Sequence, residues 1–132
     1  AGFAYRTGWA HHTSADLWIQ AASAGEAWLA VSIIKQLCTV PQIRILVTAT
    51  TAQGMEILES GLEPMIRKRR SDICIQWFPF DAPFIIENTI KAVAPRVMVL
   101  LETEIWPALF FFLKQNKSKI MIINARMSEK SF

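Results

Sequence analysis

Short apolar runs alternate with amphipathic segments along most of this chain. Five runs are mainly apolar, and they cover residues 17–21, 43–48, 73–78, 97–101 and 120–123, of which 43–48 is rich in β-branched residues. The segments between them have helical patterns or composition, and they cover residues 23–37, 51–60, 62–69, 83–94 and 106–115. Strands without regular polar alternation are typical of parallel sheets that are covered on both faces. The pattern therefore predicts a doubly wound, Rossmann-like α/β domain with a parallel sheet of about five strands.

Proline and glycine mark several predicted helix ends. Pro83 and Pro107 fall in the first turn of two predicted helices, where the missing N–H of proline does no harm. Gly61 follows a helical stretch, and we expect it to end that helix as a C-cap, with a second short helix after it. Residues 1–16 form a lead segment before the first predicted strand.

Polar and charged residues follow the predicted strands. Right-handed crossovers place the carboxyl ends of all strands at one edge of a parallel sheet, which is where such sheets bind ligands. The residues that we expect at this rim are Ser23, Gly25, Glu26, Thr50, Asp81, Glu102, Glu104, Trp106, Asn124, Arg126 and Ser128. The sequence therefore predicts that the chemistry of the protein lies at this edge.

The carboxylates at the rim allow two interpretations. Ser23 and Glu26 have the spacing of a capping box, in which each side chain accepts a hydrogen bond from the other residue's backbone N–H. Alternatively, Glu26 is a base that the helix dipole keeps ionised, available to take a proton from a hydroxyl group. Glu102 and Glu104 either lie in a solvated turn between a strand and a helix, or they bring a second carboxylate to the same cleft as Glu26. Carboxylates from two strand ends would suit hydroxyl activation and a cationic sugar transition state.

Other site types have little support. The first turn has one glycine where a dinucleotide fingerprint needs three, and no phosphate-binding P-loop is present. His11 and His12 are adjacent in a polar segment, which favours a surface loop over a metal site. Cys38 and Cys74 lie in apolar patterns and are expected to be buried, reduced thiols.

The excess of positive charge is local. The chain has 132 residues, 52% of them hydrophobic, and a formal net charge of +3. Arg67, Lys68, Arg69 and Arg70 form one basic run, and without these four the 14 basic residues fall to 10 against 11 acidic ones. The run is either a solvated helix end or a contact with an anionic surface. It has no interleaved aromatic residues, so we do not expect it to bind nucleic acid.

No segment reads as a membrane-spanning helix. The nearest candidate, residues 97–113, is interrupted by Glu102, Glu104 and Pro107. Within it, the run Phe110–Phe112 is expected to serve packing first, because at least one ring must face the core. The chain begins at Ala1 without a signal pattern, so we expect any native leader to be absent from this sequence.

Taken together, the rim motifs resemble the amino-terminal half of the 3-deoxy-D-manno-octulosonic acid (Kdo) transferases. Residues 23–26 resemble that family's Ser-Val-Gly-Glu, residues 48–54 its threonine-rich turn, and residues 79–83 its Pro-Tyr-Asp-Leu-Pro. Residues 101–107 resemble Met-Glu-Thr-Glu-Leu-Trp-Pro, and residues 124–128 are similar to Asn-Ala-Arg-Leu-Ser. The chain departs from the family pattern at Ala24, Phe80 and Ala108, where valine, tyrosine and asparagine are usual.

The resemblance implies half of a GT-B glycosyltransferase of lipopolysaccharide biosynthesis, with no metal and no cofactor. The implied partners are a lipid A precursor, CMP-Kdo as donor and the anionic surface of the inner membrane, on its cytoplasmic face. Glu26 would be the general base and Glu102 would support the transition state, with inversion at the anomeric carbon. The other rim residues would bind the acceptor, and residues 67–70 would touch the membrane surface. The donor would bind a second domain that this chain lacks, so we expect the chain to fold alone but to be inactive.

The residues also allow two other functions. One is a stand-alone module that binds anionic lipid or nucleic acid through residues 67–70. The other is a different GT-B relative, such as a sugar-nucleotide epimerase.

Overall fold

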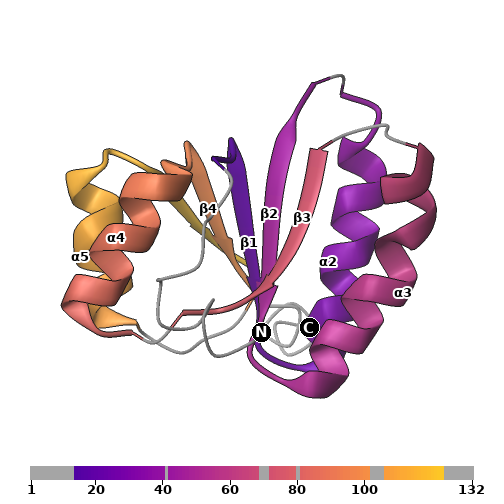
Figure 1. The fold of residues 1–132 in the computed structure, drawn as a ribbon, viewed down its shortest axis with the longest axis horizontal. Coiled ribbons are helices and arrows are strands. Elements are labelled where there is room, and N and C mark those ends of the chain that lie inside the picture. The colour runs from indigo at the N-terminus through magenta and orange to yellow at the C-terminus, as the bar shows by residue number, and fades with distance from the viewer. Residues whose placement is uncertain (1–13, 41, 69–71, 80, 102–105, 124–132) are drawn as a thin grey trace, which may run out of the picture.

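The computed structural model describes residues 14–40, 42–68, 72–79, 81–101 and 106–123. They form a five-stranded parallel sheet with helices on both faces (Figure 1). The strands are β1 (Leu17–Ala21), β2 (Arg44–Ala49), β3 (Asp72–Trp77), β4 (Val97–Leu100) and β5 (Lys119–Ile122). The helices are α2 (Ala24–Leu37), α3 (Ala52–Lys68), α4 (Pro83–Val93) and α5 (Pro107–Gln115). The predicted doubly wound α/β fold is confirmed.

The sheet has the strand order β3-β2-β1-β4-β5. The central strand β1 pairs with both β2 and β4, so that Gln20 stands between Thr48 and Leu100. The chain winds outward from β1 to β3 and then returns to the other side of β1 for β4 and β5. This reversal makes the boundary between β1 and β4 the topological switch point, outside which doubly wound sheets bind their ligands.

Successive strand residues point into two separate cores. Leu17, Ile19 and Ala21 of β1 belong to the core under α2 and α3, whereas Trp18 belongs to the core under α4 and α5. Figure 1 shows the two helix pairs on opposite sides of the sheet. Every residue of β1 is buried, which explains why the sequence of this strand shows no regular polar alternation.

The prediction that Gly61 ends a helix is wrong. Helix α3 continues through Gly61 and Pro64 to Lys68. A Cβ atom on residue 61 would lie 2.8 Å from Cγ2 of Val31 in α2, so the glycine permits the two helices to approach closely. Pro64 removes one hydrogen bond from the helix interior. The buried residues that anchor α3 against the sheet are Gly54, Leu58, Leu62 and Met65. The other predicted elements are confirmed, with ends within one residue of those expected.

The two cysteines are free thiols, as predicted. Cys38 is buried at the end of α2, but Cys74 is only half-buried, because its strand β3 lies at an edge of the sheet. Among the residues that the structure describes, no helix is long and apolar enough to cross a membrane.

An ion pair joins β1 to β2 at the amino edge of the sheet. The Asp16 carboxylate accepts hydrogen bonds from the Arg44 guanidinium at 3.1 Å and from the Arg44 backbone N–H at 3.1 Å. The Asp16 carbonyl accepts from the backbone N–H groups of Arg96 and Val97. The hydrogen bond from the Arg44 side chain is the main reason that the pKa of Asp16 lies below its ordinary value.

The close approach of α2 and α3 can be tested with Gly61→Ala. Alanine is the better helix former, but its methyl group would collide with Val31, so we expect a net loss of about 1–3 kcal/mol in unfolding free energy. Urea denaturation of the chain measures this loss. Val31→Ala makes room for the methyl group, so the double variant should lose less than the sum of the single variants. A Gly61→Ala protein as stable as the wild type would contradict the contact.

The Asp16–Arg44 pair predicts a pH-dependent stability. A lowered folded-state pKa means that the stabilisation is present above the unfolded pKa of about 3.9 and is lost as the pH falls through the folded value. Asp16→Asn should therefore lower the unfolding free energy at pH 7 by about 0.5–1 kcal/mol. The gap to the wild type should close as the pH is lowered toward 3, measured by urea denaturation across this range. A gap that stays constant with pH would show that the charge of Asp16 contributes nothing.

Candidate functional site

The turn between β1 and α2 holds a half-buried carboxylate at the carboxyl edge of the sheet. Ser23 is the N-cap of α2, and its Oγ accepts a hydrogen bond from the N–H of Glu26 at 3.3 Å. Glu26 Oε1 accepts from the N–H of Ala22 at 2.8 Å. The capping interpretation is therefore confirmed for Ser23, but the glutamate bonds the residue before the cap rather than the cap itself. Its carboxylate lies in the first turn of α2, at the positive end of the helix dipole.

The turn between β2 and α3 is hydrogen-bonded to the turn between β1 and α2. Thr50 Oγ1 donates to the carbonyl oxygen of Ala22 at 3.2 Å, so the Ala22 N–H is held by Glu26 and its carbonyl by Thr50. Thr51 Oγ1 accepts from the N–H of Gly54 at 3.0 Å at the start of α3. Of the predicted rim residues, Ser23, Glu26 and Thr50 are thus brought together by direct contacts to one segment of backbone.

Asp81 holds the start of α5. Its Oδ1 accepts from the N–H of Leu109 at 3.0 Å and its Oδ2 from the N–H of Ala108 at 3.3 Å. The N-cap position of α5 is occupied by Trp106, whose side chain has no acceptor oxygen. Asp81 therefore supplies the missing cap from another loop. Its predicted contact with an acceptor substrate stays a prediction.

Aromatic rings link the rim to the core beneath α4 and α5. The ring centroid of Trp106 lies 5.0 Å from that of Phe78, which lies 6.0 Å from that of Trp18. Trp106 is half-buried, whereas Phe78 and Trp18 are almost fully buried. Trp106 is thus supported from below and contributes its accessible part to the rim.

Several predicted site residues lie outside the described residues: Glu102, Glu104, Asn124, Arg126 and Ser128. The residues just before them are described. Leu101 donates its N–H to the carbonyl of Gln20 at 3.1 Å, and Ile123 donates to the carbonyl of Leu100 at 2.9 Å. The chain therefore enters both segments from the carboxyl edge, and the first of them follows a strand that borders the switch point.

The described part of the basic run, Arg67 and Lys68, lies at the opposite edge of the sheet. Arg67 and Lys68 are exposed in the last turn of α3, which runs back from the carboxyl edge toward the amino edge (Figure 1). Arg67 Nε lies 3.6 Å from the Glu63 carboxylate one turn earlier. Arg69 and Arg70 lie outside the described residues. The described half of the run has the surroundings of a solvated helix end, and its contact with a membrane surface stays a prediction.

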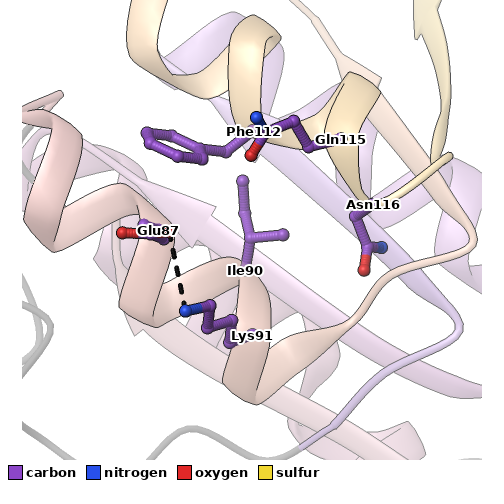
Figure 2. Close-up of a pocket in the computed structure, with 6 residues that line it drawn as sticks. All are labelled: Glu87, Ile90, Lys91, Phe112, Gln115 and Asn116. Carbon is purple, nitrogen blue, oxygen red and sulfur yellow. Dashed lines mark ion pairs between the residues drawn. The ribbon is translucent and has the colours of Figure 1, made fainter.

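Two hollows flank the helix pair α4 and α5. One, of about 460 Å³, lies at the rim, where Asp81 borders it together with Pro107 and the exposed ring of Phe111. The other, of about 190 Å³, lies between the two helices, and Figure 2 shows Phe112 and Ile90 beside the ion pair of Glu87 and Lys91. The second hollow is lined by this solvated ion pair, by the apolar side chains of Ile90 and Phe112, and by the amides of Gln115 and Asn116.

The phenylalanine run serves packing, as predicted, for two of its three rings. Phe110 and Phe112 are half-buried against the core, and Phe111 is 56% exposed. Among the described residues, no group of three or more His, Cys, Asp or Glu side chains could hold a metal ion.

Comparison with known proteins decides which family these features belong to. The family described as 3-deoxy-D-manno-octulosonic-acid transferase (kdotransferase) matches residues 1–132. The chain belongs to this family. The resemblance inferred from the rim motifs is therefore confirmed. Membership of this family argues against both a stand-alone binding module and an epimerase.

Individual relatives give the same result. The 3-deoxy-D-manno-octulosonic acid transferase of Rickettsia felis is 32% identical over 117 residues, covering 88% of this chain and 24% of the relative. A probable mitochondrial 3-deoxy-D-manno-octulosonic acid transferase of Arabidopsis thaliana is 30% identical, covering 88% and 25%. A bifunctional glycosyltransferase/methyltransferase of Fusobacterium nucleatum is 27% identical, covering 88% and 17%. The chain thus spans about a quarter or less of the length of these curated relatives.

Sequence reasoning missed three buried polar residues below the rim. Gln20, Thr48 and Gln76 are 0%, 1% and 4% exposed, near the carboxyl ends of β1, β2 and β3. The available signal is a glutamine, with two donors and an acceptor, inside each of the otherwise apolar runs of residues 17–21 and 73–78.

The capping role of Asp81 predicts a loss of stability rather than a change in fold. Asp81→Ala removes two hydrogen bonds to the start of α5 and should lower the unfolding free energy by about 0.5–2 kcal/mol in urea denaturation. Asp81→Asn keeps one acceptor oxygen and should lose less. The matched control is Glu87→Ala on α4, which removes only a surface ion pair and should cost less than about 0.5 kcal/mol. Equal losses for Asp81→Ala and Glu87→Ala would rule out the cap.

Proposed function

We propose that this chain is the acceptor-binding domain of an inverting glycosyltransferase. The complete enzyme would move Kdo from CMP-Kdo to a lipid A precursor in lipopolysaccharide biosynthesis. The observation that carries this proposal is the Glu26 carboxylate, held in the first turn of α2 beside the switch point of a chain that belongs to the Kdo transferase family. Ligands of doubly wound sheets bind at this location.

The proposed reaction assigns one role to each carboxylate. Glu26 takes the proton from the acceptor hydroxyl as its oxygen forms a bond to the anomeric carbon of Kdo. The bond from that carbon to the CMP phosphate oxygen breaks, and CMP leaves with the electron pair. Glu102 stabilises the positive charge that develops on the sugar. Attack from the face opposite CMP inverts the anomeric centre, so no covalent enzyme intermediate is required.

The rest of the rim is proposed to bind the acceptor. Ser23, Gly25 and Thr50 belong to the two turns around Glu26, and Trp106 offers an aromatic surface at the start of α5, which Asp81 caps. The proposed contributors outside the described residues are Glu104, Asn124, Arg126 and Ser128.

Donor binding is assigned to a second domain. The relatives are about four times longer than the matched region, which leaves room for a CMP-Kdo site outside this chain. The enzyme would act as a peripheral protein on the cytoplasmic face of the inner membrane, where its acceptor lies. Residues 67–70 would contribute attraction to the anionic surface, at about 1 kcal/mol for each basic residue before screening.

The role of Glu26 as base can be separated from its role in the fold. In Glu26→Gln the amide oxygen still accepts from the Ala22 N–H, but the side chain can no longer take a proton. We expect kcat of the full-length enzyme to fall by about 10²–10⁴ with little change in thermal stability. The assay is transfer from CMP-Kdo to the lipid A precursor.

The matched control is Glu56→Gln, which neutralises an exposed glutamate on α3 and should leave kcat unchanged. Wild-type turnover by Glu26→Gln would remove the proposed base. Absence of transfer by the wild-type full-length enzyme would reject the proposed function itself.

Gly25 provides a second test, because stability and function should respond in opposite directions. It is exposed at the second position of α2, and a Cβ atom there would meet nothing within 4 Å. Gly25→Ala should therefore raise the unfolding free energy by about 0.5–1 kcal/mol, since alanine loses less entropy in a helix. The added methyl group would occupy the space that we assign to the acceptor, so the acceptor KM should rise severalfold. An unchanged KM in a stabilised enzyme would show that the acceptor does not approach Gly25.

A further inference from the structure

A row of polar side chains is buried in the core beneath the rim. Gln20, Thr48 and Gln76 are 0%, 1% and 4% exposed, and Thr48 is the register partner of both glutamines. Gln20 lies two positions after Trp18 on β1, so it points to the same face of the sheet, under α4 and α5. Only Ala21 follows it in the strand, so the row lies just below the carboxyl edge.

The hydrogen bonds of this row run in one direction. The Nε1–H of Trp18 can only donate, and it donates to Thr48 Oγ1 at 2.9 Å. The Thr48 hydroxyl in turn donates to Gln20 Oε1 at 2.6 Å. This chain of bonds sets the orientation of the Gln20 amide, with its oxygen toward Thr48 and its Nε2 turned away.

The Nε2 group of Gln20 is a buried donor with no acceptor among the described residues. Its two N–H groups have no hydrogen-bond partner in that part of the chain, and the atom is inaccessible to solvent. The Nε2 of Gln76, in the same row, donates to Cys74 Sγ at 3.2 Å. An unmet buried donor destabilises the fold, and an apolar side chain of similar size would avoid that cost. Nearly all buried polar groups in folded proteins are paired, so an exception calls for a function.

The location of Gln20 indicates what that function is. Gln20 belongs to the strand that borders the switch point, between Thr48 of β2 and Leu100 of β4. Thr48 already occupies the amide oxygen. The Gln20 backbone carbonyl also accepts the N–H of Leu101, the last described residue before residues 102–105. Gln20 therefore lies one residue below the carboxyl edge at the switch point, where the reacting groups are proposed to meet.

We propose that Gln20 is a positioning residue of the Kdo transfer, an inference that rests on the proposed function. Its Nε2 donates to an oxygen atom that reaches the carboxyl edge between β1 and β4 when the site is complete. The Gln20 amide would hold this oxygen in place, and the amide is itself oriented by its hydrogen bond from Thr48, which accepts from Trp18. The oxygen belongs either to a carboxylate of the rim or to the bound acceptor, and both present the same lone pairs to the amide.

The test compares two buried glutamines of one row in the full-length enzyme. Gln20→Met keeps the length of the side chain and removes both donors. We expect kcat/KM to fall at least tenfold, while thermal stability stays equal to the wild type or rises, because the unmet donor is gone. Gln76→Met removes an amide that already has a partner, so it should lower thermal stability and leave kcat and KM unchanged.

The kinetic constants also identify the source of the oxygen. A fall in kcat at unchanged acceptor KM indicates a carboxylate of the rim, whereas a raised acceptor KM indicates an oxygen of the acceptor. Thr48→Val is the second variant, because it keeps the shape of the side chain and releases the Gln20 amide from its fixed orientation. It should change the same kinetic constant as Gln20→Met, by a smaller factor.

Three results would overturn the inference: wild-type kinetics in Gln20→Met, wild-type kinetics in Thr48→Val, or an equal kinetic loss in Gln76→Met. The inference and the proposed function fail separately. If the wild type transfers Kdo and Glu26→Gln does not, but Gln20→Met is fully active, only the role of Gln20 is rejected.

Discussion

Burial of β1 on both faces is the constraint on which the rest of this structure depends. A strand with no face open to water must satisfy its backbone through neighbouring strands, so β1 pairs with β2 on one side and β4 on the other. The order in which strands are added to the sheet reverses direction at the boundary between β1 and β4. The turn that carries Glu26 and the segment that follows β4 therefore border the same point of the carboxyl edge. The location of the candidate site is a consequence of how the centre of the sheet is paired.

The rim itself is built largely from side chains that satisfy backbone groups. Glu26, Thr50 and Asp81 all contact main-chain atoms of neighbouring turns. Each of these contacts joins two segments that are separate in sequence or connects a loop to a helix start. Polar residues at this edge therefore have two tasks, because the groups that would meet a ligand also hold together the surface that receives it.

The sequence predicted most of the fold, because buried parallel strands leave a clear apolar signal and right-handed crossovers place their ends at one edge. It failed where the outcome depended on a tertiary neighbour. Gly61 looks like a helix end until Val31 is placed against it, and the partners of Asp81 belong to a helix that starts 26 residues later in the sequence. Half-burial of Cys74 follows from the edge position of β3, which only strand order reveals. Gln20 is not predicted as a buried donor, because one polar residue does not interrupt an apolar run and its hydrogen bonds depend on the neighbouring strand.

The contact between Gly61 and Val31 reaches beyond the stability of the helix pair. Helix α3 approaches α2 closely at this point, and its first turn also comes near the start of α2, where Gly54 faces the Ser23 carbonyl. These two points of close approach, about two turns apart on α3, oppose sliding or rolling of α2 on the sheet by itself. Together with the hydrogen bond from the Ala22 N–H, they orient the Glu26 carboxylate in the folded chain. The entropy of orienting the proposed base is lost during folding, so little of it remains to be lost when the reacting groups come together.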